Sequence, residues 1–189
     1  MNSNKNLVFL GMMGSGKSSI GAMLSKKLNI PFIDIDNLIE EHAGMTVTEI
    51  FEENGEDYFR NLEEKITIKS LKHKKVVVSL GGGSFINDKI RKDILKNHFS
   101  FWLDWHDLIL IKRIKGSKKR PLASNSTDLE IKAIINKRKK IYSKANFKIN
   151  CNKLTKSEIV KTIIKTYELT LQSHPFTVFI KLSEVGWHR

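Results

Sequence analysis

The sequence predicts a single α/β domain in which helices cover both faces of a parallel sheet. Short runs rich in β-branched and aromatic residues alternate with longer runs whose apolar residues recur at helical spacing. The chain has 189 residues, which is enough for one such domain with a sizeable core. Strands that alternate with helices are typical of a parallel sheet covered on both faces, and ligands gather at the carboxyl ends of its strands.

Five strands and the helices between them follow from these patterns. The predicted strands are Leu7–Leu10, Pro31–Ile35, Val76–Leu80, Phe99–Leu103 and Phe147–Cys151. The predicted helices are Ser19–Leu28, Asn37–Ala43, two between Thr46 and Glu63, Asp88–Asn97, one carrying Leu108 and Ile111, Asp128–Ala145, and one from about Ser157 to Ser173. Thr46 and Glu49 have the spacing of a capping box, Gly55 divides the two helices that follow, and Thr155 or Ser157 caps the last helix.

Residues 11–18 carry the strongest motif, G-x-x-x-x-G-K-S, directly after the first predicted strand and before the first predicted helix. Glycines let backbone N–H groups curl around an anion, and the helix directs its positive end toward the same anion. We therefore expect a phosphate-binding loop for ATP and Mg²⁺, in which Lys17 reaches the terminal phosphates and the Ser18 hydroxyl holds the metal. The expected nucleotide-binding residues here are Gly14, Ser15, Gly16, Lys17, Ser18 and Ser19.

Two carboxylates follow the second predicted strand, and because Asp34 and Asp36 are two residues apart they point to the same side of an extended chain. A carboxylate beside a phosphate loop can hold the water shell of Mg²⁺, and the other can accept a proton from an attacking hydroxyl. The alternative is that Asp36 only caps the following helix. The neighbouring phosphate loop favours a functional role for at least one of them.

The third predicted strand ends in Gly81, Gly82 and Gly83, and three glycines at a strand end allow very close approach of the backbone to a ligand. A long polar stretch, at about residues 115–127, has no clear period and includes Lys118, Lys119 and Arg120. Beside a triphosphate site it is expected to be a mobile lid that brings positive charge over the phosphates. The alternative is a flexible basic loop.

Composition narrows the class of protein. The formal charge is +13, but most of it comes from lysines spread along the whole chain, whereas arginine is scarce. Arginine offers a planar fork suited to carboxylate and phosphate, so each arginine is the more informative. No apolar run approaches the length that spans a bilayer, and a cleaved signal peptide would remove the phosphate loop, so a cytoplasmic protein is expected. The lone Cys151 is expected to be a small buried hydrophobe.

From about Leu7 to Tyr167 the chain resembles the shikimate kinases. Six motifs match in order: the phosphate loop with Gly21 behind it, Asp34-Ile35-Asp36, Ile50-Phe51 with Gly55-Glu56 and Phe59-Arg60, Gly81-Gly82-Gly83, Arg120-Pro121-Leu122, and Arg138 four residues before Tyr142. The resemblance implies a phosphate-loop kinase fold, with a five-stranded parallel sheet of order 2-3-1-4-5 and a mobile lid. It also implies ATP-dependent phosphorylation of the 3-hydroxyl of shikimate, giving shikimate 3-phosphate and ADP in the pathway to chorismate and the aromatic amino acids.

The resemblance also implies roles for individual residues. Asp36, Arg60, Gly81, Gly82, Gly83 and Arg138 would bind shikimate. Of these, Asp36 would orient and deprotonate the attacking hydroxyl, and Arg60 and Arg138 would hold the substrate carboxylate. Ser18 and Asp34 would serve the Mg²⁺. Arg120 would be the lid arginine that contacts ATP and acts in catalysis with Asp36 and Lys17, and Arg113 would lie near the adenine.

Two alternatives stay open at this point. One is another small kinase of similar build, acting on gluconate or a nucleoside monophosphate; Asp36, Arg60 and the three glycines argue against it. The other is a nucleic-acid-binding ATPase, which the positive charge alone suggests, although Trp102, Trp105 and Trp187 do not fall in the lysine-rich runs. We expect a monomer with a kinase domain over residues 1–175, a tail of unassigned role over 176–189, and neither a nucleic-acid nor a membrane partner.

Overall fold

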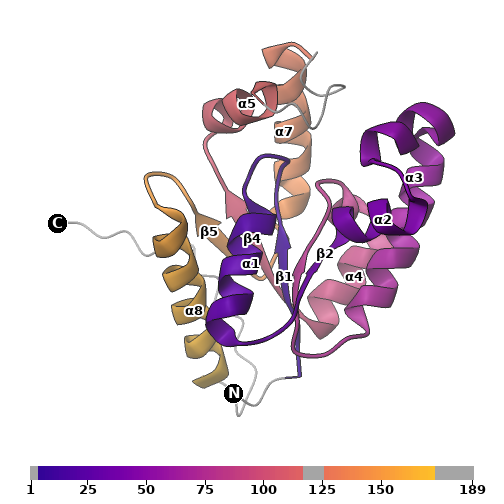
Figure 1. Ribbon diagram of the computed structural model, residues 1–189. Coiled ribbons are helices and arrows are strands. Elements are labelled where there is room, and N and C mark those ends of the chain that lie inside the picture. The colour runs from indigo at the N-terminus through magenta and orange to yellow at the C-terminus, as the bar shows by residue number, and fades with distance from the viewer. Residues whose placement is uncertain (1–3, 117–125, 173–189) are drawn as a thin grey trace.

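The computed structural model of the protein describes residues 4–116 and 126–172 (Figure 1). The strands are β1 (Leu7–Leu10), β2 (Phe32–Asp34), β3 (Val77–Ser79), β4 (Phe99–Asp104) and β5 (Phe147–Asn150). The helices are α1 (Lys17–Leu28), α2 (Ile35–Ala43), α3 (Val47–Leu71), α4 (Asp88–Asn97), α5 (Asp107–Lys115), α7 (Asp128–Tyr142) and α8 (Lys156–Gln172), with a short 3₁₀ helix η1 (Ser84–Ile86). Most of the predicted lid, including Arg120, and the predicted tail 176–189 lie outside the described residues.

The five strands form one parallel sheet of order β2-β3-β1-β4-β5, which confirms the predicted fold class. The connection from β1 to β2 runs in the opposite direction to the three that follow. Right-handed crossovers therefore place α1 on one face and the later crossover helices on the other. Helix α8 packs beside α1, and α3 packs beside α4 (Figure 1).

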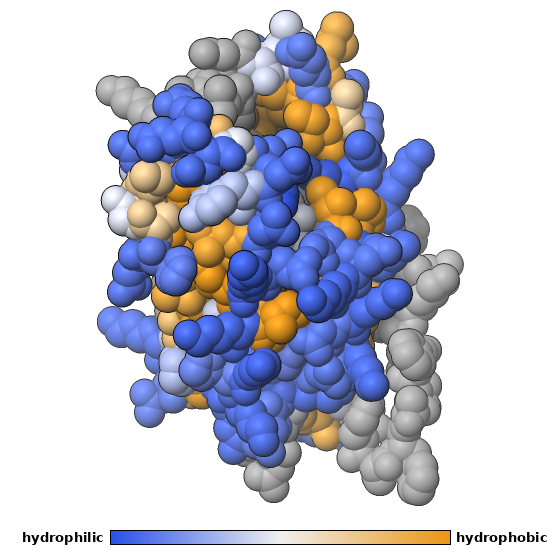
Figure 2. All heavy atoms as spheres, turned by 90° about the vertical axis from the view of Figure 1, so that its right-hand side faces the viewer, coloured by the Kyte–Doolittle hydropathy of each residue, from blue (hydrophilic) through white to orange (hydrophobic). Residues whose placement is uncertain are grey.

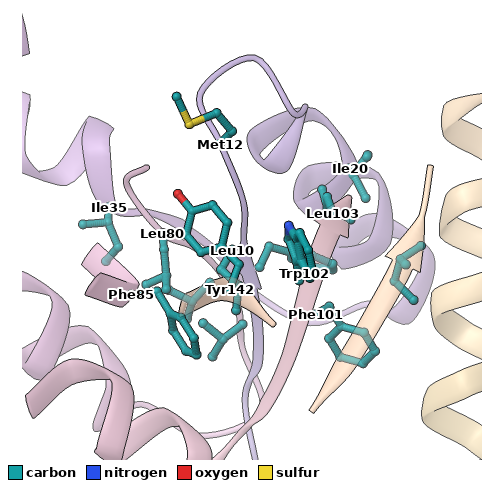
Figure 3. Packing of buried hydrophobic residues seen from close by; sticks show 14 of the residues in the cluster. Leu10, Met12, Ile20, Ile35, Leu80, Phe85, Phe101, Trp102, Leu103 and Tyr142 are labelled. Atoms are coloured by element: carbon teal, nitrogen blue, oxygen red, sulfur yellow. The ribbon is translucent and has the colours of Figure 1, made fainter. Parts of the chain in front are cut away.

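The core lies between the sheet and these helices. Val8, Phe9, Val77, Val78 and Phe101 are inaccessible to solvent, as expected for strands covered on both faces. In Figure 3 the ring of Tyr142, from α7, lies among core side chains that include Leu10 and Leu80. On the surface that faces right in Figure 1, hydrophilic side chains predominate, with hydrophobic atoms visible between them (Figure 2). None of the described helices combines the length and the apolar character needed to cross a membrane.

The helix ends follow local chemistry. Thr46 and Glu49 form the predicted capping box at the start of α3, and Gly55 has φ 81° and ψ 173°, which breaks the helical geometry where the sequence predicted a division. Thr155 and Glu158 bond reciprocally before α8, so Thr155 rather than Ser157 is the cap. The prediction that Asp36 could cap α2 is wrong. Asp34 is the cap, with Oδ1 accepting the N–H groups of Asp36 and Asn37, so α2 begins two residues earlier than predicted.

The entry to β1 is held by a buried asparagine. Asn6 is inaccessible to solvent; its Nδ2 donates to the carbonyl oxygens of Leu71 (3.1 Å) and His73 (2.7 Å), and its Oδ1 accepts the Val76 N–H (3.2 Å). One amide thus joins β1 to the connection between α3 and β3. This geometry uses both a donor and an acceptor, which a carboxylate cannot supply.

We predict that Asn6→Asp lowers the free energy of unfolding by about 2 kcal/mol or more, because a buried carboxylate would face two carbonyl oxygens. Urea unfolding at pH 7 measures this. The matched control is Asn4→Asp, the same change at an exposed position two residues away, which should alter stability by less than about 0.5 kcal/mol. Equal effects of the two changes would contradict the role assigned to Asn6.

His98 lies next to Asn6 and links folding to pH. It is 8% exposed, and burial together with the Lys5 charge lowers its pKa below the ordinary 6.5, although Asp93 opposes the shift. Just below pH 6.5 the unfolded chain therefore binds a proton that the folded chain does not. The free energy of unfolding must then fall as the pH drops below 6.5.

We predict that the parent protein loses stability between pH 7.5 and 5.5, and that His98→Gln loses less over the same interval. Urea unfolding at the two pH values measures the difference. The pKa values of Glu49, Glu64, Glu130 and Glu158 are lowered from 4.5, so these carboxylates titrate at more acidic pH than this interval. The comparison with the variant separates His98 from the five other histidines. An identical pH slope in the variant would show that His98 is not responsible.

Candidate active site

The phosphate loop joins β1 to α1 at the carboxyl end of the sheet. Gly14 (φ 76°) and Gly16 (φ 87°) adopt the left-handed conformation that favours glycine. The first turn of α1 has no side-chain cap, so its N–H groups face the concave side where an anion would bind. Lys17 is 7% exposed, and its Nζ donates to the carbonyl oxygens of Gly11 (2.9 Å) and Met12 (3.2 Å). The loop therefore has the geometry that the motif predicts.

Asp34 ends β2 and lies beside this loop. Its Oδ1 caps α2, whereas its Oδ2 is one of four buried side-chain oxygens in the described residues without a hydrogen-bond partner. Asp36 lies in the first turn of α2, so the two carboxylates do not share one extended segment as the sequence spacing suggested. Because α2 begins between them, the two carboxylates occupy different positions in the site. Asp34 remains at the base of the site, and Asp36 approaches the glycines after β3.

The three glycines after β3 allow charged side chains to pack directly on the backbone. A Cβ at Gly81 would clash with the Glu63 carboxylate and lie 2.7 Å from Asp36 Oδ1. A Cβ at Gly83 would overlap the Arg60 guanidinium, and one at Gly82 would lie 3.4 Å from Arg138 Nη1. The three glycines therefore serve close approach among the protein's own groups as well as access for a ligand.

Arg60 projects from α3 and is held from several sides. Its Nη1 donates to Glu63 Oε2 at 2.7 Å, its Nε and Nη2 donate to Glu56 Oε1 at 3.1 Å, and its guanidinium lies over the Phe59 ring, 5.1 Å from the centroid. Glu63 is buried, and its Oε1 accepts the Ser84 hydroxyl at 2.6 Å. Burial opposes the charge of Arg60, but the two glutamates outweigh it and raise the pKa. The guanidinium is therefore fixed and fully charged.

Arg138 comes from α7 on the opposite side of the glycines. Its Nη1 lies 3.7 Å from the Met12 sulfur, so it touches the phosphate loop. One helical turn later, the Tyr142 hydroxyl donates to the Gly82 carbonyl oxygen at 2.5 Å. Burial raises the pKa of Tyr142 to about 12, although the Arg138 charge opposes the shift, so the hydroxyl remains a donor at neutral pH. One helix thus places both a cation and a support for the glycine backbone.

These groups surround one cavity of about 400 Å³. Its lining includes seven of the eight residues predicted to bind the metal or the substrate: Ser18, Asp34, Asp36, Arg60, Gly82, Gly83 and Arg138. The other predicted loop residues lie in the adjoining phosphate loop, and Gly81 contacts Asp36 without lining the cavity. The cavity also has an apolar wall that includes Val47, Phe51 and Phe59, so it suits a small anion with an apolar ring face.

Arg113 lies on the nucleotide side. It projects from α5, its Nη1 donates to the Gly14 carbonyl oxygen at 3.2 Å, and its guanidinium lies over the Trp105 ring. Arg113 therefore contacts the phosphate loop, and its expected place near the adenine stays a prediction. Sequence reasoning missed Glu63, Tyr142 and Trp105 as members of the site. Only Glu63 had a local signal, its spacing from Arg60 on one helix.

Mg²⁺ fits the residues that were predicted to hold it. Among the described residues there is no cluster of three or more His, Cys, Asp or Glu that could enclose a metal. Mg²⁺ needs no such cluster, because it keeps several waters and is bound by one or two protein groups together with substrate phosphates. Asp34, whose Oδ2 is buried and unpartnered, and Ser18 both line the cavity, so together they offer that kind of donor set.

Known proteins resemble this chain over most of its length. The family model for shikimate kinase matches residues 13–168. A shikimate kinase from Sulfurihydrogenibium sp. is 42% identical over 160 residues, which cover 85% of this chain and 96% of that protein. One from Aquifex aeolicus is 39% identical, over 86% and 95% of the two chains.

Solved structures give the same result. The shikimate kinase from Aquifex aeolicus superimposes with a TM-score of 0.79 at 36% identity, covering 89% of this chain and 99% of the other. The shikimate kinase from Acinetobacter baumannii, solved with shikimate, has a TM-score of 0.83 at 25% identity, covering 90% and 96%. A gluconokinase from Sinorhizobium meliloti has a TM-score of 0.54 at 16% identity, which shows a shared fold alone. The matched motifs, the sheet order and these similarities together show that this chain belongs to the shikimate kinase family.

Proposed function

We propose that this protein transfers the γ-phosphoryl group of ATP to the 3-hydroxyl of shikimate, giving shikimate 3-phosphate and ADP. The carrying observation is the cavity beside the phosphate loop, in which the Asp36 carboxylate lies with two guanidinium groups, Arg60 and Arg138. Phosphoryl transfer requires positioning and charge neutralisation more than covalent chemistry. The proposal also includes a monomeric enzyme in the cytoplasm, acting in the pathway to chorismate.

On the acceptor side, Arg60 and Arg138 hold the shikimate carboxylate. The guanidinium fork matches a carboxylate in two parallel hydrogen bonds, and both arginines project into the cavity from different helices. Glu63 keeps the Arg60 guanidinium oriented before the substrate arrives, which reduces the entropy lost on binding. Gly81, Gly82 and Gly83 let the acceptor approach the backbone, and Asp36 orients the 3-hydroxyl and accepts its proton.

On the donor side, the phosphate loop holds the ATP phosphates. The backbone of Gly14, Ser15 and Gly16 and the N-terminus of α1, with Ser19 in its first turn, supply hydrogen-bond donors and positive potential. Lys17 exchanges its carbonyl partners for terminal phosphate oxygens, and Arg113 lies beside the base. Mg²⁺, held by Ser18 and through water by Asp34, neutralises charge on the phosphates when bound. We assign Arg120 to the lid as a further phosphate contact.

An assay of ADP release with different acceptors tests the proposal. Shikimate should support Mg²⁺-dependent ADP release, with shikimate 3-phosphate identified as the product. Gluconate and the nucleoside monophosphates should give no release above the rate without acceptor. Turnover with gluconate or a nucleoside monophosphate, and not with shikimate, would refute the assignment.

We predict that Arg138→Lys raises the KM for shikimate by roughly ten- to hundredfold, because lysine keeps the charge but cannot form a two-point contact with a carboxylate. The KM for ATP should change by less than about twofold. Steady-state kinetics with each substrate varied in turn measures both constants. Lys137→Arg, the reverse exchange at the exposed neighbouring position, is the matched control and should leave both constants unchanged. An unaltered KM for shikimate in Arg138→Lys would remove Arg138 from the carboxylate site.

We predict that Asp34→Asn raises the Mg²⁺ concentration for half-maximal activity about tenfold or more. Asparagine still caps α2, because its Oδ1 accepts the same N–H groups. It removes the negative charge and replaces the buried Oδ2 by an amide nitrogen. Activity as a function of Mg²⁺ concentration measures the effect, and thermal unfolding checks that the fold is retained. A stable variant with the parent's Mg²⁺ dependence would exclude Asp34 from the metal site.

A further inference from the structure

Trp105, which follows β4 directly, connects two parts of the nucleotide side. Its side chain is largely buried, with the residue 7% exposed. The indole Nε1 donates to the Ser15 carbonyl oxygen at 2.9 Å, and the Arg113 Cζ lies 3.9 Å from the ring centroid. One side chain therefore touches both the phosphate loop and the arginine beside it.

The hydrogen bond to Ser15 orients a peptide group in the loop. The Ser15–Gly16 peptide is planar and trans, so a carbonyl directed at the indole sends the Gly16 N–H in the opposite direction. Gly16 has φ 87° and no side chain, and it precedes α1 without a side-chain cap, so it has few restraints of its own. The indole supplies a restraint that the local sequence lacks.

The stacked ring restrains Arg113 in a comparable way. Arg113 is exposed on α5, and a long exposed side chain normally samples many rotamers. Here the guanidinium lies on the Trp105 ring and donates to the Gly14 carbonyl oxygen at 3.2 Å. A Cβ at Gly14 would lie 3.3 Å from the Arg113 Cβ, so the loop and α5 are in direct contact.

We propose that Trp105 is a positioning residue for the nucleotide: it fixes the Ser15 carbonyl and the Arg113 guanidinium before ATP binds. This inference rests on the proposed function only in that ATP is the phosphoryl donor. Trp105 contacts neither the acceptor cavity nor its arginines among the described residues. Its effect should therefore fall on nucleotide affinity and leave shikimate affinity unchanged.

Two substitutions separate the two contacts. Trp105→Phe removes the indole N–H but keeps an aromatic ring under Arg113, and should weaken ADP binding about three- to tenfold. Trp105→Leu also removes the ring and should weaken it by at least about a further threefold. Titration calorimetry with Mg²⁺ and ADP measures the affinities. It needs no acceptor, so it remains informative even if shikimate proves not to be the substrate.

The matched control is Trp102→Phe, which removes the buried indole of β4, three residues before Trp105. Trp102 is 5% exposed and contacts Lys148 and Tyr142 rather than the phosphate loop. It should lower the melting temperature, as the Trp105 variants should, without changing ADP affinity by more than about twofold. In steady-state kinetics the Trp105 variants should raise the KM for ATP in the order Phe then Leu, with the KM for shikimate unchanged.

Fluorescence gives a second readout. The chain has three tryptophans, so in the Trp102→Phe, Trp187→Phe double variant Trp105 is the single emitter. ADP bound beside the Arg113–Trp105 stack should change its emission with a midpoint equal to the calorimetric Kd. The proposal is overturned if ADP affinity in both Trp105 variants stays within twofold of the parent's, if Trp102→Phe weakens ADP equally, or if ADP leaves the emission unchanged.

Discussion

The ion pair between Glu63 and Arg60 is the interaction on which the acceptor cavity depends. Glu63 is 3% exposed, and a carboxylate so deeply buried is tolerated only when its oxygens are paired. One oxygen accepts from Arg60 and the other from Ser84, which joins α3 to the segment after β3. Glu63 and Asp36 both occupy the space that a Cβ at Gly81 would fill. The position of Glu63 in the ion pair therefore requires a glycine at residue 81. The cavity thus has its charges ordered before any ligand enters.

The two halves of the site meet at the carboxyl edge of the sheet. Arg138 contacts Met12 of the phosphate loop, and Tyr142, on the same helix, bonds the Gly82 carbonyl of the acceptor side. The phosphate loop and the acceptor side are therefore both in direct contact with α7. This arrangement suits phosphoryl transfer, in which the donor and the acceptor must be aligned within a fraction of an ångström.

Prediction from the sequence was most accurate for features that depend on residues close together in the chain. The buried strands and the phosphate loop have patterns that a short window contains, and all five strands lie within two residues of their predicted bounds. The start of α2 was misjudged because Asp34 and Asp36 are both good caps, and packing, not propensity, decides between them. Ser84 lies 21 residues from Glu63, and Trp105 lies 90 from Ser15. The spacing of such pairs follows no helical or strand period, so these contacts are found only in the folded structure.

Lys17 shows how the site is stable without its ligand. A buried ammonium group without partners would be costly, and here the Gly11 and Met12 carbonyl oxygens accept its protons. Under the proposed function ATP would bind by exchange: phosphate oxygens would replace the carbonyl oxygens as partners of the lysine. The gain lies in the difference between a charged and a neutral acceptor, since a phosphate oxygen adds Coulomb attraction between opposite charges to the hydrogen bond that the ammonium group already makes with a carbonyl oxygen. Arg60 is also satisfied without a ligand, but its partners are already charged: Glu56 and Glu63 hold the guanidinium in place. A loop and a cavity that satisfy themselves in this way can stay folded and still bind selectively, because only an anion improves on what is already there.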